Sequence, residues 1–257
     1  MTRLAKGEEL VGHDATTPAG QLVLVTGTGT GIGKTHVAAA LLRAWARALS
    51  ASGVARPQVA GLKPVESGVT AGAPTDAATL EQASTFHVKR FQPPYMLARA
   101  VSPHLAALDE GVTIELSVIR RYVSEVRAQC DGVVLELAGG LFTPLGEALS
   151  NADVARALGP TAVLLVAPDR LGVLHDVAAA TRAAEAEGLR VTGLVLVAPE
   201  LADASTGTNA GQMRVVTDVR VLAELPRATT EHLAEREDLS AIVRAIVSER
   251  LAAMSRA

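Results

Sequence analysis

The sequence predicts a single α/β domain in which a parallel β-sheet carries helices on both faces. Three observations support this fold class. Short aliphatic runs alternate along the chain with longer segments of helical periodicity. The runs are continuously aliphatic, as strands buried on both faces of a parallel sheet are. Hydrophobic residues make up 49% of the chain and aromatic residues only 2%, so Ala, Val and Leu must build the core.

The expected strands are aliphatic runs of four to seven residues, near Leu22–Thr26, Val59–Leu62, Gly132–Leu137, Ala162–Val166, Val191–Val197 and Val219–Glu224. The expected helices are longer and amphipathic, near Lys34–Ala51, Asp76–Ser84, Pro103–Leu108, Ile114–Ala128, Asn151–Leu158, Leu174–Glu187 and Leu239–Met254. Residues 1–20 precede any periodic pattern, and we expect them to form a flexible extension. The domain itself then spans residues 21–257, with ligands at the carboxyl ends of its strands.

Composition excludes several classes of protein. The formal net charge is −3, so no basic field indicates nucleic-acid binding. No apolar run approaches the roughly 18 residues of a membrane span, and the first residues lack the apolar stretch of a secretory signal. Cys130 is the single cysteine, which rules out an internal disulfide or a cysteine-based zinc site. We therefore expect a cytoplasmic enzyme.

The stretch LVLVTGTGTGIGKT, residues 22–35, predicts a phosphate-binding loop between a strand and a helix. Glycines at alternate positions from 27 to 33 let the backbone turn its N–H groups toward phosphate oxygens, and the helix N-terminus adds positive partial charge. Lys34 is placed to reach the β- and γ-phosphates, and the Thr35 hydroxyl to bind Mg²⁺. The expected nucleotide contacts are Gly29, Thr30, Gly31, Ile32, Gly33, Lys34, Thr35 and His36.

The spacing of this loop departs from the general motif. Five residues separate Gly27 from Gly33, where the general motif has four. The alternative interpretation is a glycine-rich turn followed by an ordinary surface lysine. The strand, the loop, the Lys-Thr pair and the helix occur in the required order. We therefore interpret the segment as a nucleotide-binding loop.

Three further polar residues occur at or near predicted strand ends. Lys63 closes the second strand, and Pro64 directs the chain out of the sheet, although a solvated lysine is the alternative. Asp76 opens a helix, where either Asp76 or Thr75 could simply be the N-cap. Glu136 interrupts an aliphatic strand, and a buried carboxylate is costly unless it is paired or bound to metal. Mg²⁺ on a nucleotide usually takes one or two carboxylates, so Glu136 is a candidate ligand.

With these motifs assembled, the sequence resembles the dethiobiotin synthase family, ATP-dependent enzymes of biotin biosynthesis in the P-loop NTPase superfamily. The matching motifs occur in family order over residues 22–226, and the five-residue loop spacing is the one that this family has. KPVESG together with SPHLAA is far more specific than the phosphate-binding loop. The motifs are TGTGTGIGKT (26–35), KPVESG (63–68), Asp76, SPHLAA (102–107), ELAGGLFTPL (136–145), RLG (170–172) and ELP (224–226).

The resemblance implies a reaction and its partners. The substrates are 7,8-diaminopelargonate, carbon dioxide or bicarbonate, and ATP, with Mg²⁺ as the metal. One amine takes up carbon dioxide as a carbamate, ATP phosphorylates the carbamate, and the second amine closes the cyclic urea of dethiobiotin. ADP and phosphate are released. The resemblance also implies a homodimer.

Roles for residues of this sequence follow from the same resemblance. Lys34 and Lys63 are the catalytic residues, which neutralise the carbamate and the γ-phosphate. The implied metal ligands are Thr35, Asp76 and Glu136. Nucleotide contacts extend beyond the loop to Asp76, Glu136, Gly139 and Pro226. The implied substrate contacts are Thr30, Lys63, Ser67, Gly139, Leu171 and Gly172.

Three positions depart from the family pattern. Leu137 stands where glycine is common, and its side chain is expected to narrow the cleft. Residues 197–200, VAPE, lack the Asn that reads adenine, which predicts weak discrimination among nucleoside triphosphates. His175 and Asp176 replace an Asn-His pair that in the family lies at the dimer interface and helps bind the substrate's tail carboxylate. These two residues either make a different contact or simply start a helix, since Asp is favoured near a helix N-terminus.

Two other classes of protein remain alternatives. A partitioning-type P-loop ATPase switch has a similar fold, but it carries a second lysine early in the loop, where this chain has Thr28 and Gly29. A related P-loop ligase acting on a different amine is compatible with the departures at His175 and Asp176, because fold alone does not fix the substrate.

Overall fold

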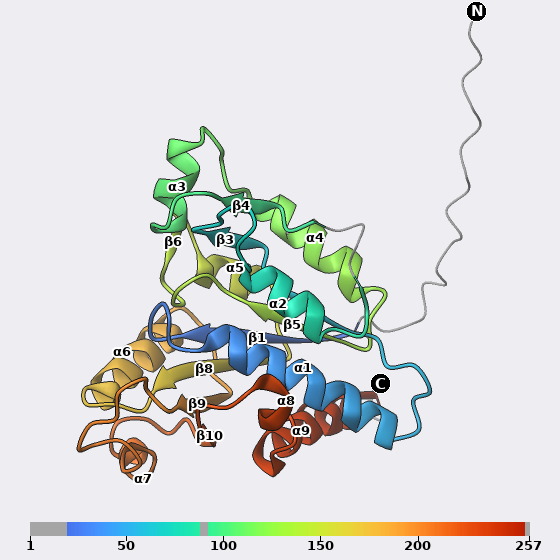
Figure 1. The fold of residues 1–257 in the computed structure, drawn as a ribbon, viewed down its shortest axis with the longest axis vertical. Coiled ribbons are helices and arrows are strands. Elements are labelled where there is room, and N and C mark those ends of the chain that lie inside the picture. Colours follow the sequence, from blue (N-terminus) through green and yellow to red (C-terminus); the bar gives the residue numbers. More distant parts are fainter. Residues whose placement is uncertain (1–19, 88–91, 255–257) are drawn as a thin grey trace, which may run out of the picture.

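The computed structural model describes residues 20–87 and 92–254 (Figure 1). Within them, six parallel strands form the central sheet in the order β10-β9-β8-β1-β5-β2. The strands are β1 (Gln21–Gly27), β2 (Val59–Leu62), β5 (Gly132–Glu136), β8 (Ala162–Pro168), β9 (Gly193–Val197) and β10 (Val221–Leu225). The expected parallel α/β fold is confirmed. Among the described residues, no helix is both long and apolar enough to cross a membrane.

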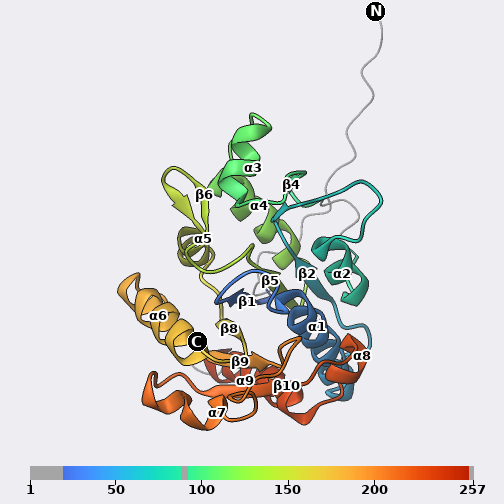
Figure 2. The ribbon, with the colours of Figure 1, turned by 60° about the vertical axis from the view of Figure 1, so that its left-hand side comes forward.

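Helices cover both faces of this sheet (Figures 1 and 2). One face packs against α1 (Lys34–Ala51), α2 (Asp76–Ala83), α8 (Thr230–Leu233) and α9 (Glu237–Met254). The other face packs against α4 (Leu116–Arg127), α5 (Asn151–Leu158), α6 (Val173–Ala186) and the short 3₁₀ helix η1 (Met213–Val215). Helix α3 (Pro103–Asp109) lies against the short strands β3 (Val65–Ser67), β4 (Tyr95–Leu97) and β6 (Pro144–Gly146), and α7 (Asn209–Gln212) lies beside α6 and η1. Two aliphatic clusters fill the two interfaces between sheet and helices, as burial of both sheet faces requires.

Small residues let the helices approach the sheet closely. A Cβ atom at Gly132, at the start of β5, would lie 2.4 Å from the indole of Trp45 in α1. A Cβ at Gly61 in β2 would lie 2.5 Å from Leu42 and 2.9 Å from Leu80, which belongs to α2. The glycines therefore set the depth at which α1 and α2 seat against the sheet.

Strand β2 is an edge of the sheet, and polar side chains from the end of α2 protect it. The Ser84 hydroxyl accepts a hydrogen bond from the backbone N–H of Gly61 (2.8 Å), and the Thr85 hydroxyl accepts one from Val59 (2.9 Å). Unpaired edge groups invite pairing with another chain, so these bonds close the edge. They also fasten the end of α2 along β2, the strand that Lys63 follows.

Each strand and helix expected from the sequence is present, with ends that differ by up to two residues. Two small two-stranded sheets were not expected: β3 (Val65–Ser67) with β4 (Tyr95–Leu97), and β6 (Pro144–Gly146) with β7 (Leu149–Ser150). The short helices α7, η1 and α8 were also missed. Strands of two or three residues carry too little periodicity to be recognised in sequence.

The N-terminal extension expected at residues 1–20 falls almost wholly outside the described residues. Gly20, its last residue, is buried, and its backbone N–H donates to the carbonyl of Arg127 (3.1 Å). The ordered domain therefore includes Gly20. The extent of the domain and of its extension stays a prediction.

Candidate active site

The candidate site lies where the strand order reverses. Strand β1 lies between β5 and β8. The chain first builds the sheet on one side of β1, with β2 and β5, and then on the other side, with β8, β9 and β10. At such a reversal, the connections that follow two adjacent strands run to opposite faces of the sheet. This leaves a crevice at the carboxyl ends of the two strands. The phosphate-binding loop begins at the end of β1, Glu136 ends β5, and Lys63 follows β2 directly. Register pairs Val25 with Glu136 and Leu62 with Leu135, which brings these strand ends together.

The loop between β1 and α1 has the backbone that a phosphate site needs. Gly31 (φ 72°) and Gly33 (φ 92°) take left-handed conformations that other residues rarely adopt. Gly33 directly precedes α1, so the free N–H groups of the first helical turn open into the loop. Lys34 is only 5% exposed, and its ammonium donates to the Gly29 carbonyl at 2.7 Å. The lysine therefore folds back over its own loop, at the place where phosphate oxygens are expected.

Lys63, Asp76 and Glu136 form a charge cluster beside this loop, in which Lys63 and Glu136 are buried and Asp76 is partly exposed. The Lys63 ammonium donates to Glu136 Oε1 at 2.8 Å and is also hydrogen-bonded to Asp76 Oδ2. The Thr35 hydroxyl donates to the same Glu136 oxygen at 3.0 Å. Glu136 therefore links the loop to the end of β2. The lysine and the three proposed metal ligands belong to one connected group.

The electrostatics of the two lysines differ. Burial lowers the pKa of Lys34, and the nearby Lys63 ammonium lowers it further, against opposing attraction from Glu136 and Asp76. Burial also acts to lower the pKa of Lys63, but attraction and hydrogen bonds from Glu136 and Asp76 outweigh it, so that this pKa is raised. Burial raises the pKa of the Glu136 carboxyl, with Lys63 opposing. Because Lys63, Glu136 and Asp76 all act on the pKa of Lys34, the two ammonium groups belong to one site.

A cavity of about 480 Å³ adjoins the cluster. Its size suits a small organic ligand. Of the sequence-predicted residues it contains Thr30, Lys63, Ser67, Asp76 and Gly139. The Ser67 hydroxyl donates to the Val101 carbonyl (2.7 Å) and keeps its lone pairs for a ligand. Residues 100–103, at and just before the start of the SPHLAA motif, also line this cavity.

A second cavity, of about 590 Å³, lies on the other side of the phosphate-binding loop. Thr30 borders both cavities, so the loop separates them. This cavity includes the loop residues Gly31, Ile32, Gly33 and His36. Its outer part is formed by residues 197–200 and 225–228, among them Pro226. A cavity of this size beside the loop has room for the base and ribose of a nucleotide.

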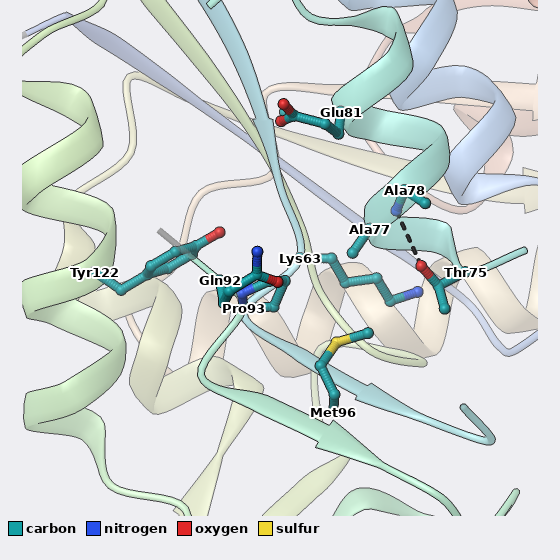
Figure 3. A pocket seen from close by; sticks show the side chains of 10 residues that line it. Lys63, Thr75, Ala77, Ala78, Glu81, Gln92, Pro93, Met96 and Tyr122 are labelled. Carbon is teal, nitrogen blue, oxygen red and sulfur yellow. Dashed lines mark hydrogen bonds between the residues drawn. The ribbon is translucent and has the colours of Figure 1, made fainter. Parts of the chain in front are cut away.

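A third cavity, of about 360 Å³, lies behind Lys63 and reaches Tyr122 and Met96. In Figure 3 the Lys63 side chain runs beside it and points toward the first turn of α2, away from Tyr122. In that turn the Thr75 hydroxyl accepts a hydrogen bond from Ala78 N–H at 3.0 Å. Thr75, rather than Asp76, is therefore the N-cap of α2, which leaves the Asp76 carboxylate for Lys63.

The cluster fits a magnesium ion bound on phosphates. Among the described residues, Glu136 Oε2 is one of three buried side-chain polar atoms without a hydrogen-bond partner, which leaves an oxygen for a cation. Thr35, Asp76 and Glu136 supply a hydroxyl and two carboxylates, the oxygen donors that Mg²⁺ takes beside phosphate. The described residues contain no group of three or more His, Cys, Asp or Glu arranged for a metal. The site accordingly suits a metal carried by nucleotide rather than a cage made of protein alone.

The glycine-rich turn after β5 is held by side chains that the sequence analysis did not single out. Asn151, 1% exposed, donates from its amide to the carbonyls of Ala138 (2.7 Å) and Gly140 (2.8 Å). The Thr143 hydroxyl accepts from Gly140 N–H at 2.9 Å. Gly139 itself has φ 68°. An Asn at the start of a helix normally indicates a cap, so nothing in the sequence pointed to this clamp.

Several sequence-predicted residues lie elsewhere. Leu171 is 75% exposed, and with Gly172 it forms the link between β8 and α6, outside the cavity that contains Lys63. Asp176 lies in the first turn of α6 and pairs with Arg170 (3.4 Å), as a helix-start residue does. Leu137 packs in the core with 2% exposure, so the expectation that it narrows the cleft was wrong. Successive side chains of a strand point to opposite faces of the sheet, so Leu137 points into the same core cluster as Leu135, and Glu136 points the other way.

A glycine-rich loop and a lysine-threonine helix start, set at the reversal of a parallel sheet, define a P-loop nucleoside triphosphatase fold. Residues 21–232 match the family model described as an AAA domain. The fold is similar to a ParA family ATPase from Chlorobium tepidum TLS (TM-score 0.52, 14% identity, 89% of this chain and 99% of that one). It is also similar to the MinC:MinD cell division protein complex of Aquifex aeolicus (TM-score 0.53, 11% identity, 89% and 96%). At these identities the likeness concerns the fold alone.

Sequence relatives are more specific. The chain is 40% identical over 208 residues to the ATP-dependent dethiobiotin synthetase BioD of Anaeromyxobacter dehalogenans (strain 2CP-C), covering 79% of this chain and 89% of that protein. It is 39% identical over 208 residues to the protein of the same name from Ralstonia nicotianae, covering 79% and 87%. The chain belongs to the dethiobiotin synthetase family. The family resemblance expected from the motifs is thereby confirmed.

Proposed function

We propose that this chain is an ATP-dependent dethiobiotin synthetase, which joins carbon dioxide to 7,8-diaminopelargonate and closes the cyclic urea. The names of the relatives at about 40% identity support this activity. So does the site, because it combines a triphosphate loop with a second buried ammonium group. The single observation that carries the proposal is that Thr35 and Lys63 both donate hydrogen bonds to Glu136, whose charge also acts on Lys34.

The chemistry requires two anions to be held together. One amine of the substrate adds to carbon dioxide and loses a proton, which gives a carbamate. A carbamate oxygen attacks the γ-phosphorus of ATP, and the bond to ADP breaks. Lys34 stabilises the charge that develops on the transferred phosphoryl group. Lys63 lies between the loop and the cavity of about 480 Å³, where its ammonium can bind the carbamate.

The state of Lys63 suits this role. The raised pKa keeps this side chain an ammonium, so it acts as a hydrogen-bond donor and not as a base. Its bonds to Asp76 and Glu136 support a cation-binding role for these two carboxylates. Thr35, Asp76 and Glu136 would hold Mg²⁺, and the metal would supply positive charge against the phosphates. Lys63 would then exchange its carboxylate partners for the carbamate.

Ring closure needs position more than further chemistry. The second amine attacks the carbonyl carbon of the mixed anhydride, phosphate leaves with the oxygen that joined it to carbon, and a proton is lost from nitrogen. Both amines belong to one molecule, so the effective concentration is already large. Thr30, Ser67 and Gly139 border the cavity where the two amines would lie. Leu171 and Gly172, exposed on one chain, are proposed to reach the substrate tail of a partner subunit in a homodimer.

The test is direct detection of the product. The protein is incubated with diaminopelargonate, bicarbonate, ATP and Mg²⁺, and the cyclic urea is followed by mass spectrometry. Reactions that lack bicarbonate and reactions with Lys34→Ala are the controls, and neither should form product. The expected result is one dethiobiotin for each ADP.

Other outcomes separate the alternatives. ADP formation that is stimulated by a different diamine, with no response to diaminopelargonate, would indicate a related ligase with another amine substrate. Hydrolysis of ATP that no amine stimulates would indicate an ATPase switch. Either result contradicts the proposal.

A further inference from the structure

A third carboxylate, Glu66, stands beside the active-site cluster without pairing with either lysine. It lies in β3, three residues after Lys63, and pairs in register with Met96 of β4. Only 7% of Glu66 is exposed. A carboxylate at such burial needs partners. Its position in KPVESG was noted in the sequence, but no role followed from the motif.

The partners of Glu66 are backbone N–H groups at the start of α2. One carboxylate oxygen accepts from Asp76 N–H at 2.7 Å, and the other accepts from Ala77 N–H at 3.0 Å. The first N–H groups of a helix have no partner within the helix, and they carry positive partial charge. Glu66 therefore uses both oxygens to fasten the helix end that carries Asp76.

Asp76 has little else to hold it in place. Its side chain is 44% exposed, and its bond to Lys63 is the ion pair that a bound metal would replace. The rest of α2 is anchored at some distance, through Leu80 and Ala83 in the core. Backbone bonds from Glu66 thus fix the point from which the Asp76 carboxylate projects.

We propose that Glu66 is a positioning residue, whose two hydrogen bonds to the start of α2 set the Asp76 carboxylate for the magnesium ion on the nucleotide. The inference rests on the proposed function insofar as Asp76 binds that ion. Supporting groups of this kind typically change metal affinity by about 10- to 100-fold when they are lost.

The chain offers a matched control for the test. Thr75 caps the third N–H of the same helix, that of Ala78, and does not touch the N–H groups of Asp76 or Ala77. Thr75→Ala therefore weakens the helix start without releasing Asp76. Glu66→Gln keeps the size of the side chain but turns one accepting oxygen into a donor that faces an N–H group. Glu66→Asp keeps the charge with a side chain too short to reach both groups.

The experiment measures binding of ADP by calorimetry across a series of Mg²⁺ concentrations and again with the metal chelated. For Glu66→Gln and Glu66→Asp, the Mg²⁺ concentration that gives half of the metal-dependent gain in affinity should rise about 10-fold or more. Binding of ADP without metal should stay within about twofold of the unaltered protein. Thr75→Ala should show the unaltered Mg²⁺ dependence. Dethiobiotin formation is measured beside this, and its own Mg²⁺ requirement should shift in parallel.

The outcomes are distinguishable. Unchanged Mg²⁺ dependence in both Glu66 variants, or an equal shift in Thr75→Ala, would overturn the positioning role. If Glu66→Gln does not fold, Glu66→Asp gives the decision alone. If the unaltered protein binds Mg²⁺ and ADP with the expected pattern but forms no dethiobiotin, the proposed function fails and the positioning role of Glu66 stands.

Discussion

The ammonium of Lys63 and the Oε1 atom of Glu136 lie 2.8 Å apart, on side chains that are 7% and 1% exposed. Lys63 directly follows β2, and Glu136 is the last residue of β5. These two strands are parallel neighbours, so the sheet itself brings the residues together. The same Glu136 oxygen accepts from Thr35 in the phosphate-binding helix. This carboxylate thus joins the site of the triphosphate to the lysine proposed to bind the carbamate.

Removal of the Lys63 ammonium is expected to separate binding from chemistry. Lys63→Ala should leave ADP affinity within a few-fold, since the loop and Lys34 are untouched, and should abolish dethiobiotin formation. Calorimetry and product analysis measure the two effects. Loss of nucleotide binding without a specific loss of turnover would contradict the assigned role.

The same variant should also lose stability, because it leaves the Glu136 carboxylate buried without its closest cation. Breaking a buried pair in this way costs about 3–5 kcal/mol of unfolding free energy. The double variant Lys63→Ala with Glu136→Gln should recover part of the loss, since it removes the uncompensated charge. Urea denaturation gives both values. Equal stability of the single and double variants would show that the pair is not coupled.

Nucleotide preference is expected to be weak. Among the described residues that line the cavity of about 590 Å³, none is Asn or Gln, and residues 197–199 are Val, Ala and Pro. Without an amide to read the base, the phosphates carry most of the affinity. The kcat/KM values for ATP, CTP and GTP should lie within about tenfold of one another, since one base contact is worth about 1–3 kcal/mol. Tripolyphosphate should compete with each nucleotide, whereas a hundredfold preference for ATP would refute the prediction.

Gly139 is expected to tolerate no side chain. A Cβ there would lie 2.5 Å from the Thr143 hydroxyl oxygen, and the backbone has φ 68°. Gly72 is a matched control, because it has φ 77° but open space around a Cβ. Gly72→Ala should cost about 1–2 kcal/mol from backbone strain alone and leave activity intact. Gly139→Ala should cost more stability than Gly72→Ala and should also lower kcat. If the two variants have the same stability and the same kcat, the close contact at Gly139 is unimportant.

The buried thiol of Cys130 is expected to make the unfolding free energy depend on pH in alkaline solution. Burial, and secondarily the nearby Asp131, raises the pKa of this thiol to about 12 in the folded protein. The unfolded thiol ionises near pH 9, so above that pH the unfolded state loses its proton while the folded state keeps it. Stability that the thiol contributes below pH 9 is therefore lost between about pH 9 and 12. Unfolding free energy should fall more steeply with pH than in Cys130→Ala, by at most about 1.4 kcal/mol per pH unit. Identical slopes would contradict the shifted pKa.

Most of the fold could be predicted because long elements carry strong periodicity. The alternation of aliphatic strands and amphipathic helices predicts a parallel sheet, and the motifs at strand ends place Lys63 and Glu136 at the same edge of it. The direct contact between these two residues depends on β2 lying beside β5, an order that the structure shows and the sequence did not predict.

What the sequence did not reveal depends on contacts between distant segments. The bonds of Glu66 to the start of α2 join residues ten or more positions apart across a short strand. The clamp made by Asn151 similarly involves carbonyl groups of a turn, and carbonyl groups carry no sequence signal. Leu137 was misplaced because its direction depends on where β5 ends.

The most direct test of the central claim follows oxygen from carbon dioxide into phosphate. Carbon dioxide labelled with oxygen-18 is mixed rapidly with enzyme, diaminopelargonate, ATP and Mg²⁺ in ordinary water for a single turnover, and mass spectra of phosphate and product are recorded. Attack of a carbamate oxygen on ATP predicts one labelled oxygen in the phosphate and one in the urea carbonyl of dethiobiotin. Phosphate without label, released together with labelled dethiobiotin, would contradict the account.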